Sequence, residues 1–305
     1  MKAQVDADRK VMGRLTLAVV FTGFIFFVEL AGGFITNSLA LLSDSAHVLM
    51  DVLALALSLF AIHISRLPPT ETRTYGLHRA EVVVAFVNGF TLLLVSLFIF
   101  YKAWGRLVSP PEVNGLGVLA VASLGLAVNL MVAFWLKGHA AHDLNVKSAF
   151  FHVVGDAVAS VGVIVAALVI HYTGWLVVDP LVSVFIGTII VAGAVRIINE
   201  STHILLEGVP REVDLGRVVE DLSAIEGVSG VHSLHIWSIC HNVHALSAHV
   251  DIDEAHRARQ AVILREANER LAQNHRIFYT TIQVECSECE SGETLRAIVH
   301  REHEH

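Results

Sequence analysis

Two short stretches of this sequence place a histidine four residues before an aspartate. They are His47 and Asp51 in LLSDSAHVLMDVLALAL, and His152 and Asp156 in SAFFHVVGDAVASVGV. Residues four apart share one face of a helix, so each stretch presents an imidazole beside a carboxylate. Both stretches lie inside long apolar segments, where an ionisable group costs about 2.5–3.5 kcal/mol on insertion scales and usually has a function.

These four side chains are of the types that hold one divalent cation. Zinc binds imidazole nitrogen and carboxylate oxygen at about 2.0–2.2 Å and favours four tetrahedral ligands. A softer metal would recruit thiolate or thioether, and all three cysteines lie in the C-terminal part of the chain. One such pair alone would fit a polar clamp between helices. Two pairs in separate segments favour a zinc site, with cobalt, nickel and cadmium left open.

A metal site inside a bilayer is typical of transport, because the ion can be taken up on one side and released on the other. Binding requires neutral histidine and ionised aspartate, so metal and protons compete for the same groups. The pattern therefore predicts a metal/proton antiporter. No HExxH motif occurs in an apolar segment and no GxxxxGK[ST] motif occurs at all. We expect neither an enzyme nor a nucleotide-driven pump.

The composition is that of an integral membrane protein. The chain has 305 residues, of which 54% are hydrophobic and 16% charged, against about 25% charged in an average soluble domain. The formal net charge of −8 comes with no basic surface of the kind that binds nucleic acid. We expect a lipid bilayer around the chain and no nucleic-acid partner.

Six apolar segments are long enough to cross a membrane, which takes about 20 residues each. They are approximately Leu15 to Ile35, Leu39 to Ile64, Val82 to Trp104, Leu116 to Leu136, Ala149 to Ile170 and Val177 to Ile198. Lysine and arginine gather in the loops on one side, which predicts that both termini are cytoplasmic. Lys102 and Arg106, near the other end of the third segment, are the exceptions.

The polarity changes after Glu207, and the pattern that follows predicts a helix, two strands, an amphipathic helix and a third strand. The expected fold is therefore a membrane domain of six transmembrane helices plus a small cytoplasmic α+β domain of order α-β-β-α-β. We divide the chain into residues 1–208 for transport, 209–290 for metal binding and dimerisation, and 291–305 as a flexible tail.

Three stretches resemble the cation diffusion facilitator family of divalent-metal/proton antiporters: TNSLALLSDSAHVLMD, TYGLHRAEVVVAFVNG and HVVGDAVASVGV. The resemblance implies a homodimer in the cell (inner) membrane that exports zinc from the cytoplasm by alternating access, while protons enter. It makes His47, Asp51, His152 and Asp156 the transport ligands. In that family two histidines and two aspartates go with zinc preference, and an aspartate in place of the first histidine goes with zinc and cadmium.

The same resemblance implies a metallochaperone-like cytoplasmic domain that binds regulatory zinc. Its ligand positions match His232, His249 and Glu285, which also lie on the three predicted strands and can therefore converge. Gln283 stands where some members have a histidine, which argues against a second bridged zinc there. The spacing of Cys286 and Cys289 suits zinc but supplies only half a coordination shell, so we take them as an auxiliary pair.

Arg79 and Glu207 match two family positions that pair across the dimer as a charge interlock. The resemblance leaves two alternatives open. One is a transporter of broader range that includes cadmium, cobalt or nickel. The other is a membrane-anchored metal sensor, in which the apolar segments serve only as an anchor.

Overall fold

The structure is a computed structural model and describes residues 20–65, 69–137, 144–240 and 243–286, without the side chains of 51, 54–65, 136, 144–149, 151, 152 and 286. The chain divides into two compact units. One takes Met1–Phe60 and Ala85–Ile198, and the other takes Ala61–Val84 and Asn199–His305. Each unit is described by itself.

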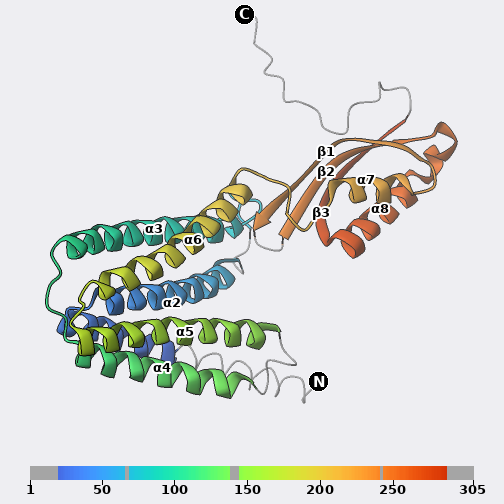
Figure 1. The fold of residues 1–305 in the computed structure, drawn as a ribbon. Helices are drawn as coiled ribbons and strands as arrows, with labels where there is room; N and C mark the ends of the chain where they lie inside the picture. Colours follow the sequence, from blue (N-terminus) through green and yellow to red (C-terminus); the bar gives the residue numbers. More distant parts are fainter. Residues whose placement is uncertain (1–19, 66–68, 138–143, 241–242, 287–305) are drawn as a thin grey trace, which may run out of the picture. The chain divides into compact units, whose positions relative to one another are not determined.

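The described part of each of the six apolar segments falls on a helix, and residues 15–19 of the first segment lie outside the described residues (Figure 1). The helices are Val20–Thr36, α2 (Leu39–Ser65), α3 (His78–Val108), α4 (Gly115–Lys137), α5 (Leu144–Thr173) and α6 (Val178–Leu205). Among the described residues, four helices are long and apolar enough to cross a membrane, and the apolar parts Val20–Thr36 and Leu39–Met50 are shorter. The helical membrane-type domain is confirmed, and six spans stay a prediction.

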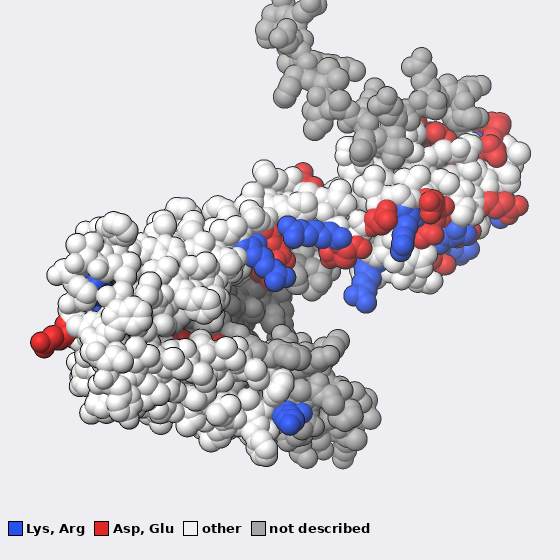
Figure 2. Space-filling model, viewed as in Figure 1, with Lys and Arg blue, Asp and Glu red and all other residues white. Residues whose placement is uncertain are grey.

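The first unit buries small and branched residues between its helices and presents large apolar residues outward. Its main core joins side chains of five helices, among them Leu41, Leu92, Val118, Val163 and Ile190. Many large apolar side chains remain exposed, including Phe27, Phe98, Phe134 and Phe185. Figure 2 shows the helical part almost without charge on the face drawn, whereas charged side chains gather over the part with the strands. Such a surface suits lipid.

A polar network, which we call the Asp179 network (Asn37, Ser38, Arg106 and Asp179), fixes the start of α2, and its Ser38 and Asp179 are buried. The Asp179 carboxylate, from the first turn of α6, accepts hydrogen bonds from Ser38 Oγ (2.6 Å) and the backbone N–H groups of Leu39 (2.8 Å) and Ala40 (3.2 Å). These N–H groups have no partner within the helix, and a carboxylate there is favoured by the helix dipole.

Arg106, an exception to the predicted charge pattern, completes this network. Its guanidinium donates to the backbone carbonyl of Asn37 (2.6 Å), to the Asn37 side-chain oxygen (2.9 Å) and to Asp179 (3.4 Å). Asn37 has a φ of 54°, in the left-handed region that asparagine tolerates better than most residues. The arginine therefore holds a turn and a helix end together.

The C-terminal domain has the predicted order: α7 (Leu215–Ser223), β1 (Val228–Cys240), β2 (Val243–Ile252), a 3₁₀ turn η1 (Glu254–Arg259), α8 (Gln260–His275) and β3 (Ile277–Cys286). The sheet runs β1-β2-β3, with β1 antiparallel and β3 parallel to β2. The helices α7 and α8 share one apolar core with the sheet, which includes Val218, Leu222, Leu246, Ile263 and Leu271. The α+β prediction is confirmed.

Alternation along the strands leaves the other face of the sheet free for polar groups. On β2, Ala248, Val250 and Ile252 are buried in the core, while His249 and Asp251 between them are half-buried. A bulge in β1 between His232 and His235 contains Ser233 at a φ of 49°. Bulges re-aim side chains near functional sites, and this one follows His232 directly.

Candidate metal sites

The membrane-type unit brings together one histidine and one aspartate of the four predicted ligands. His47 of α2 and Asp156 of α5 lie with Nε2 and Oδ1 3.7 Å apart, and Asp156 is 4% exposed. A tetrahedral zinc about 2.0–2.2 Å from both atoms would hold them roughly 3.4 Å apart. The pair is therefore close to a chelating separation. Asp51 and His152 lie on the same two helices, but their side chains are outside the described residues.

Two further buried carboxyl groups, on Glu29 and Asp44, lie near enough to Asp156 to interact with its charge. Glu29 is 1% exposed, and its Oε1 lies over Gly125, where an added Cβ would come within 2.6 Å. Its Oε2 has no hydrogen-bond partner among the described residues. Glu29 lies inside an apolar segment, where an acid is costly and usually has a function.

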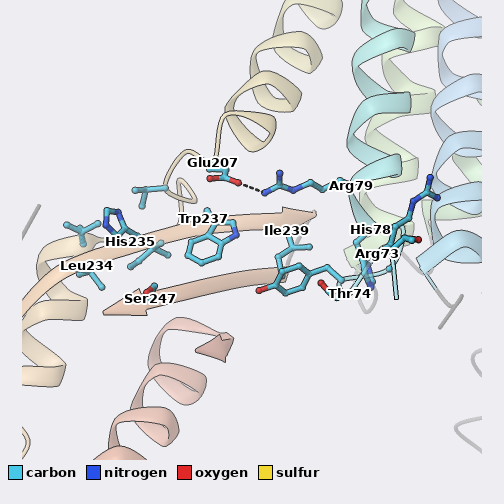
Figure 3. A pocket seen from close by; sticks show the side chains of 16 residues that line it. Arg73, Thr74, His78, Arg79, Glu207, Leu234, His235, Trp237, Ile239 and Ser247 are labelled. Carbon is cyan, nitrogen blue, oxygen red and sulfur yellow. Dashed lines mark hydrogen bonds and ion pairs between the residues drawn. The ribbon is translucent and has the colours of Figure 1, made fainter. Parts of the chain in front are cut away.

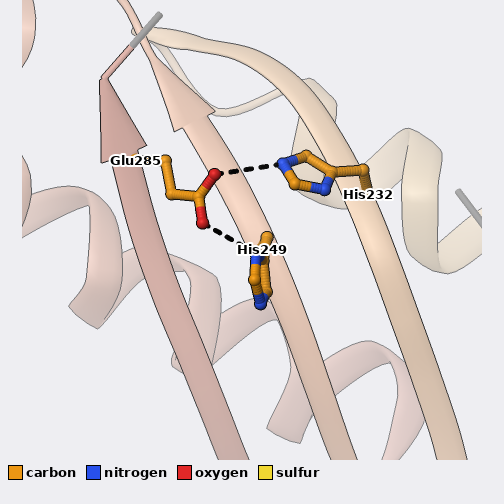
Figure 4. A group of neighbouring side chains, drawn as sticks. All are labelled: His232, His249 and Glu285. Atoms are coloured by element: carbon orange, nitrogen blue, oxygen red, sulfur yellow. Dashed lines mark ion pairs between the residues drawn. The ribbon is translucent and has the colours of Figure 1, made fainter. Parts of the chain in front are cut away.

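The C-terminal domain brings its three predicted ligands together, one from each strand (Figure 4). The ligand atoms of His232, His249 and Glu285 all lie within 4.8 Å of one another. Glu285 Oε2 is 3.4 Å from His232 Nε2, and Oε1 is 2.7 Å from His249 Nδ1. His232 is 7% exposed. Two imidazoles and one carboxylate converging on a half-buried point are donors that zinc accepts.

Strand register explains why these three residues meet. His232 and His249 are directly opposite each other on β1 and β2, with ring centroids 5.1 Å apart. Gln283 faces His249 on β3, and its side chain donates a 2.7 Å hydrogen bond to Glu285 Oε1. Gln283 thus orients the carboxylate. The side chain of Cys286 and the whole of Cys289 lie outside the described residues.

Arg79 and Glu207 form a charge pair within the single chain that the structure describes, and their pairing across a dimer stays a prediction. Arg79 Nη2 donates to Glu207 Oε1 at 2.8 Å, and both side chains are largely exposed (Figure 3). The pair lies beside an open pocket of ≈ 800 Å³ that Trp237 and Ser247 also line. The contact joins the first turn of α3 to the residues just after α6.

Cys240, at the end of β1, does not belong to either candidate site. Its burial, with a smaller contribution from the charge of Glu81, raises the pKa of the Cys240 thiol to about 11. Metal binding uses the thiolate form, which is scarce at neutral pH for such a group. Cys240 Sγ lies 3.6 Å from His78 Nδ1. The side chain acts in packing and local hydrogen bonding.

Comparison with known proteins gives a family match on both parts of the chain. The profile described as "Cation efflux transmembrane domain" matches residues 15–206. The profile ZT_dimer, described as "Cation efflux protein, cytoplasmic domain", matches residues 210–287.

Three similar proteins are bacterial. "Cadmium, cobalt and zinc/H(+)-K(+) antiporter" of Bacillus subtilis (strain 168) is 36% identical over 92% of this chain and 89% of its own length. "Metal cation efflux system protein CzcD" of Cupriavidus metallidurans is 39% identical over the same shares. "Zinc transporter ZitB" of Pectobacterium atrosepticum is 35% identical over 96% of this chain and 90% of its own length.

A solved structure titled "Metal-bound C-terminal domain of the CzcD transporter from Cuprividus metallidurans" is 37% identical to the part that it matches. It covers 24% of this chain and 99% of that chain, with a TM-score of 0.23, which is too low to carry a structural comparison.

Proposed function

Because the chain belongs to the cation diffusion facilitator family of cation efflux proteins, we propose that it exports zinc from the cytoplasm in exchange for protons. The ion would bind at His47, Asp51, His152 and Asp156. This site would open to the two sides of the membrane in turn, by alternating access. The observation that carries the proposal is the 3.7 Å approach of His47 Nε2 to Asp156 Oδ1 from two apolar helices. The names of the relatives, which include cadmium and cobalt, support the broader metal range as the alternative.

Proton coupling follows from the ligand types. Zinc needs His47 neutral and Asp156 ionised, so protonation of the same groups releases the metal. A site that opens to the more acidic side of the membrane would exchange metal for protons there. The exchange uses the proton gradient and needs no nucleotide.

We further propose that His232, His249 and Glu285 hold a regulatory zinc, with Cys286 and Cys289 as auxiliary ligands. The support is the convergence of three donor groups with Nε2 of His232 buried and without a hydrogen-bond partner among the described residues. The match to ZT_dimer supports a homodimer. The division into 1–208, 209–290 and 291–305, an inner-membrane location and cytoplasmic termini belong to the same proposal.

The test is metal flux into liposomes that contain the purified chain and have an acidic interior. Zinc should accumulate, and a protonophore should abolish the accumulation. The variants His47→Ala and Asp156→Ala should fall to the level of empty liposomes while remaining folded. His171→Ala, which removes an exposed histidine in the last turn of α5, is the matched control and should transport normally. Parallel runs with cadmium, cobalt and nickel measure the range.

Two results would contradict the proposal. Zinc flux that does not depend on the pH gradient would contradict the proposed coupling to protons. No flux at all, with zinc binding by the cytoplasmic domain intact, would favour the membrane-anchored sensor.

A further inference from the structure

A fourth side chain, Asp251, lies against the cytoplasmic cluster and was not among the predicted ligands. Its Oδ1 is 3.4 Å from His232 Nε2, the same separation as that between His232 Nε2 and Glu285 Oε2. Asp251 Oδ1 and His232 Nε2 are both buried and make no hydrogen bond among the described residues. The imidazole nitrogen thus faces two carboxylate oxygens at equal distance without bonding to either.

These separations fit a shared cation better than a hydrogen bond. A hydrogen bond between nitrogen and oxygen is about 2.7–3.2 Å long. Two ligand atoms of one tetrahedral zinc lie roughly 3.4 Å apart when each is about 2.0–2.2 Å from the metal. Both contacts of His232 Nε2 therefore have the spacing of atoms that coordinate a common ion.

The strand register of the sheet places Asp251 beside the cluster of His232, His249 and Glu285. Asp251 is directly opposite Glu285 on β3 and opposite Gly230 on β1. It is two residues after His249, so both side chains stand on the same face of β2. Like charges directly opposite each other destabilise a sheet, and a cation between Asp251 and Glu285 would reverse that effect.

Gly230 leaves the space that the Asp251 carboxylate fills. An added Cβ at Gly230 would lie 2.8 Å from Asp251 Oδ2, closer than side-chain atoms approach. A side chain at position 230 would therefore force the Asp251 carboxylate to shift from this position. The backbone at Gly230 thus lets the carboxylate remain within reach of the imidazole.

We propose that Asp251 is the fourth protein ligand of the cytoplasmic zinc, beside His232, His249 and Glu285. The inference rests on the proposed regulatory site and extends it. The cytoplasmic shell then has two imidazoles and two carboxylates, the same donor set as the proposed transport site. With Asp251 the described residues supply four ligands, so that Cys286 and Cys289 would keep only the auxiliary role proposed above.

The experiment measures zinc affinity and thermal unfolding of the full chain in detergent. His47→Ala and Asp156→Ala are present throughout, so that zinc binding in the membrane domain does not contribute. Asp251→Asn should weaken zinc binding at least roughly tenfold, a loss within the range seen when groups around a metal are removed. Gly230→Ala should also weaken it, although it removes no ligand. Asp253→Asn, an exposed acid two residues along the chain, is the control and should bind normally.

Unfolding separates a ligand from a structural ion pair. If Asp251 is a ligand, Asp251→Asn keeps or raises the unfolding temperature without zinc and reduces the increase that zinc produces. If Asp251 only pairs with His232, the zinc-free protein loses stability and zinc affinity stays unchanged, which overturns the proposal. His249→Ala is measured alongside. If His249→Ala weakens zinc binding and Asp251→Asn does not, Asp251 is not a ligand but the regulatory site stands. If neither variant weakens zinc binding, both the regulatory site and the role of Asp251 are rejected.

Discussion

At the scale of single residues, the proposed transport site depends on which donor atoms would face the ion. His47 contributes a nitrogen at a fixed position on α2, and Asp156 contributes an oxygen that is buried in α5. Zinc favours a tetrahedral shell with such mixed donors. Because a carboxylate can bind a cation through one oxygen or two, exchanging the imidazole for a carboxylate would relax the preference for four ligands.

We therefore expect His47→Asp to keep zinc flux and to raise cadmium flux relative to zinc several-fold. Competition between the two metals in the same liposomes measures the preference directly. His171→Asp, at an exposed histidine on α5, should leave the ratio as it is in the parent protein. An unchanged ratio in His47→Asp would show that position 47 does not set selectivity.

At the scale of helices and strands, two polar contacts hold elements that are distant in sequence. The Asp179 network ties the start of α2 to α3 and α6. In the C-terminal domain, Asp221 accepts hydrogen bonds from Asn274 (2.9 Å) and His275 (2.8 Å) and so ties α7 to the end of α8. Both contacts join helix ends, where backbone and side-chain donors need partners.

Asp179→Ala should lower the unfolding temperature of the purified protein in detergent. The substitution leaves the buried N–H groups of Leu39 and Ala40 without their acceptor, at about 1–3 kcal/mol for each buried unsatisfied group. Glu112→Ala is the control, because Glu112 meets Asn37 through its backbone carbonyl only. Equal unfolding temperatures for Asp179→Ala and the parent would show that the network contributes nothing to stability.

Asp221 should make the packing of α7 on α8 sensitive to acid. Hydrogen bonds from Asn274 and then His275 hold the pKa of the Asp221 carboxyl below its usual range. A group with a lowered pKa stabilises the fold above its unfolded value of about 3.9, and that stabilisation is lost as the pH falls through the folded value.

Hydrogen exchange of α7 and α8 amides, compared at equal pH, tests this. Asp221→Asn should exchange faster than the parent protein near neutral pH, and the difference should shrink below about pH 4. Glu220→Gln, on the exposed side of α7, should match the parent at every pH. A difference that persists in acid would mean that the carboxylate charge is not responsible.

At the scale of the whole molecule, local patterns in the sequence predict elements and donor types well, because helix and strand periodicities are local. They place His47 and Asp156 on helices, and His232, His249 and Glu285 on three strands. They miss Asp251, because its approach to His232 depends on a strand register that includes the bulge at Ser233.

Local sequence patterns also miss contacts between residues on helices that are distant in sequence, for the same reason. Nothing near Arg106 in the sequence points to Asn37 or Asp179, and Glu29 meets Gly125 only after helices pack. Such pairs depend on tertiary packing, which a single sequence does not display.

At the same scale, the Arg79–Glu207 pair allows a test of whether the two charges act together in the proposed transport. Their pair is exposed, so it contributes at most about 1 kcal/mol to stability. We expect Arg79→Glu to reduce zinc flux severalfold with little change in unfolding temperature, and Glu207→Arg to restore part of the flux in the double variant. Arg73→Glu, an exposed arginine in the preceding loop, is the control. Additive losses in the double variant would mean that the two charges do not act as a pair.

Because Asp179 anchors the start of α2, the distance along the helix from that end to His47 is fixed. His47 follows Ser38 by nine residues, which is about 14 Å along a helix that rises about 1.5 Å per residue. A hydrocarbon layer is about 30 Å thick. A start of α2 at one face of that layer would put the imidazole of His47 near the midplane. Lengthening this stretch by one residue would deepen the imidazole only slightly but swing it about 100° around the helix, away from Asp156.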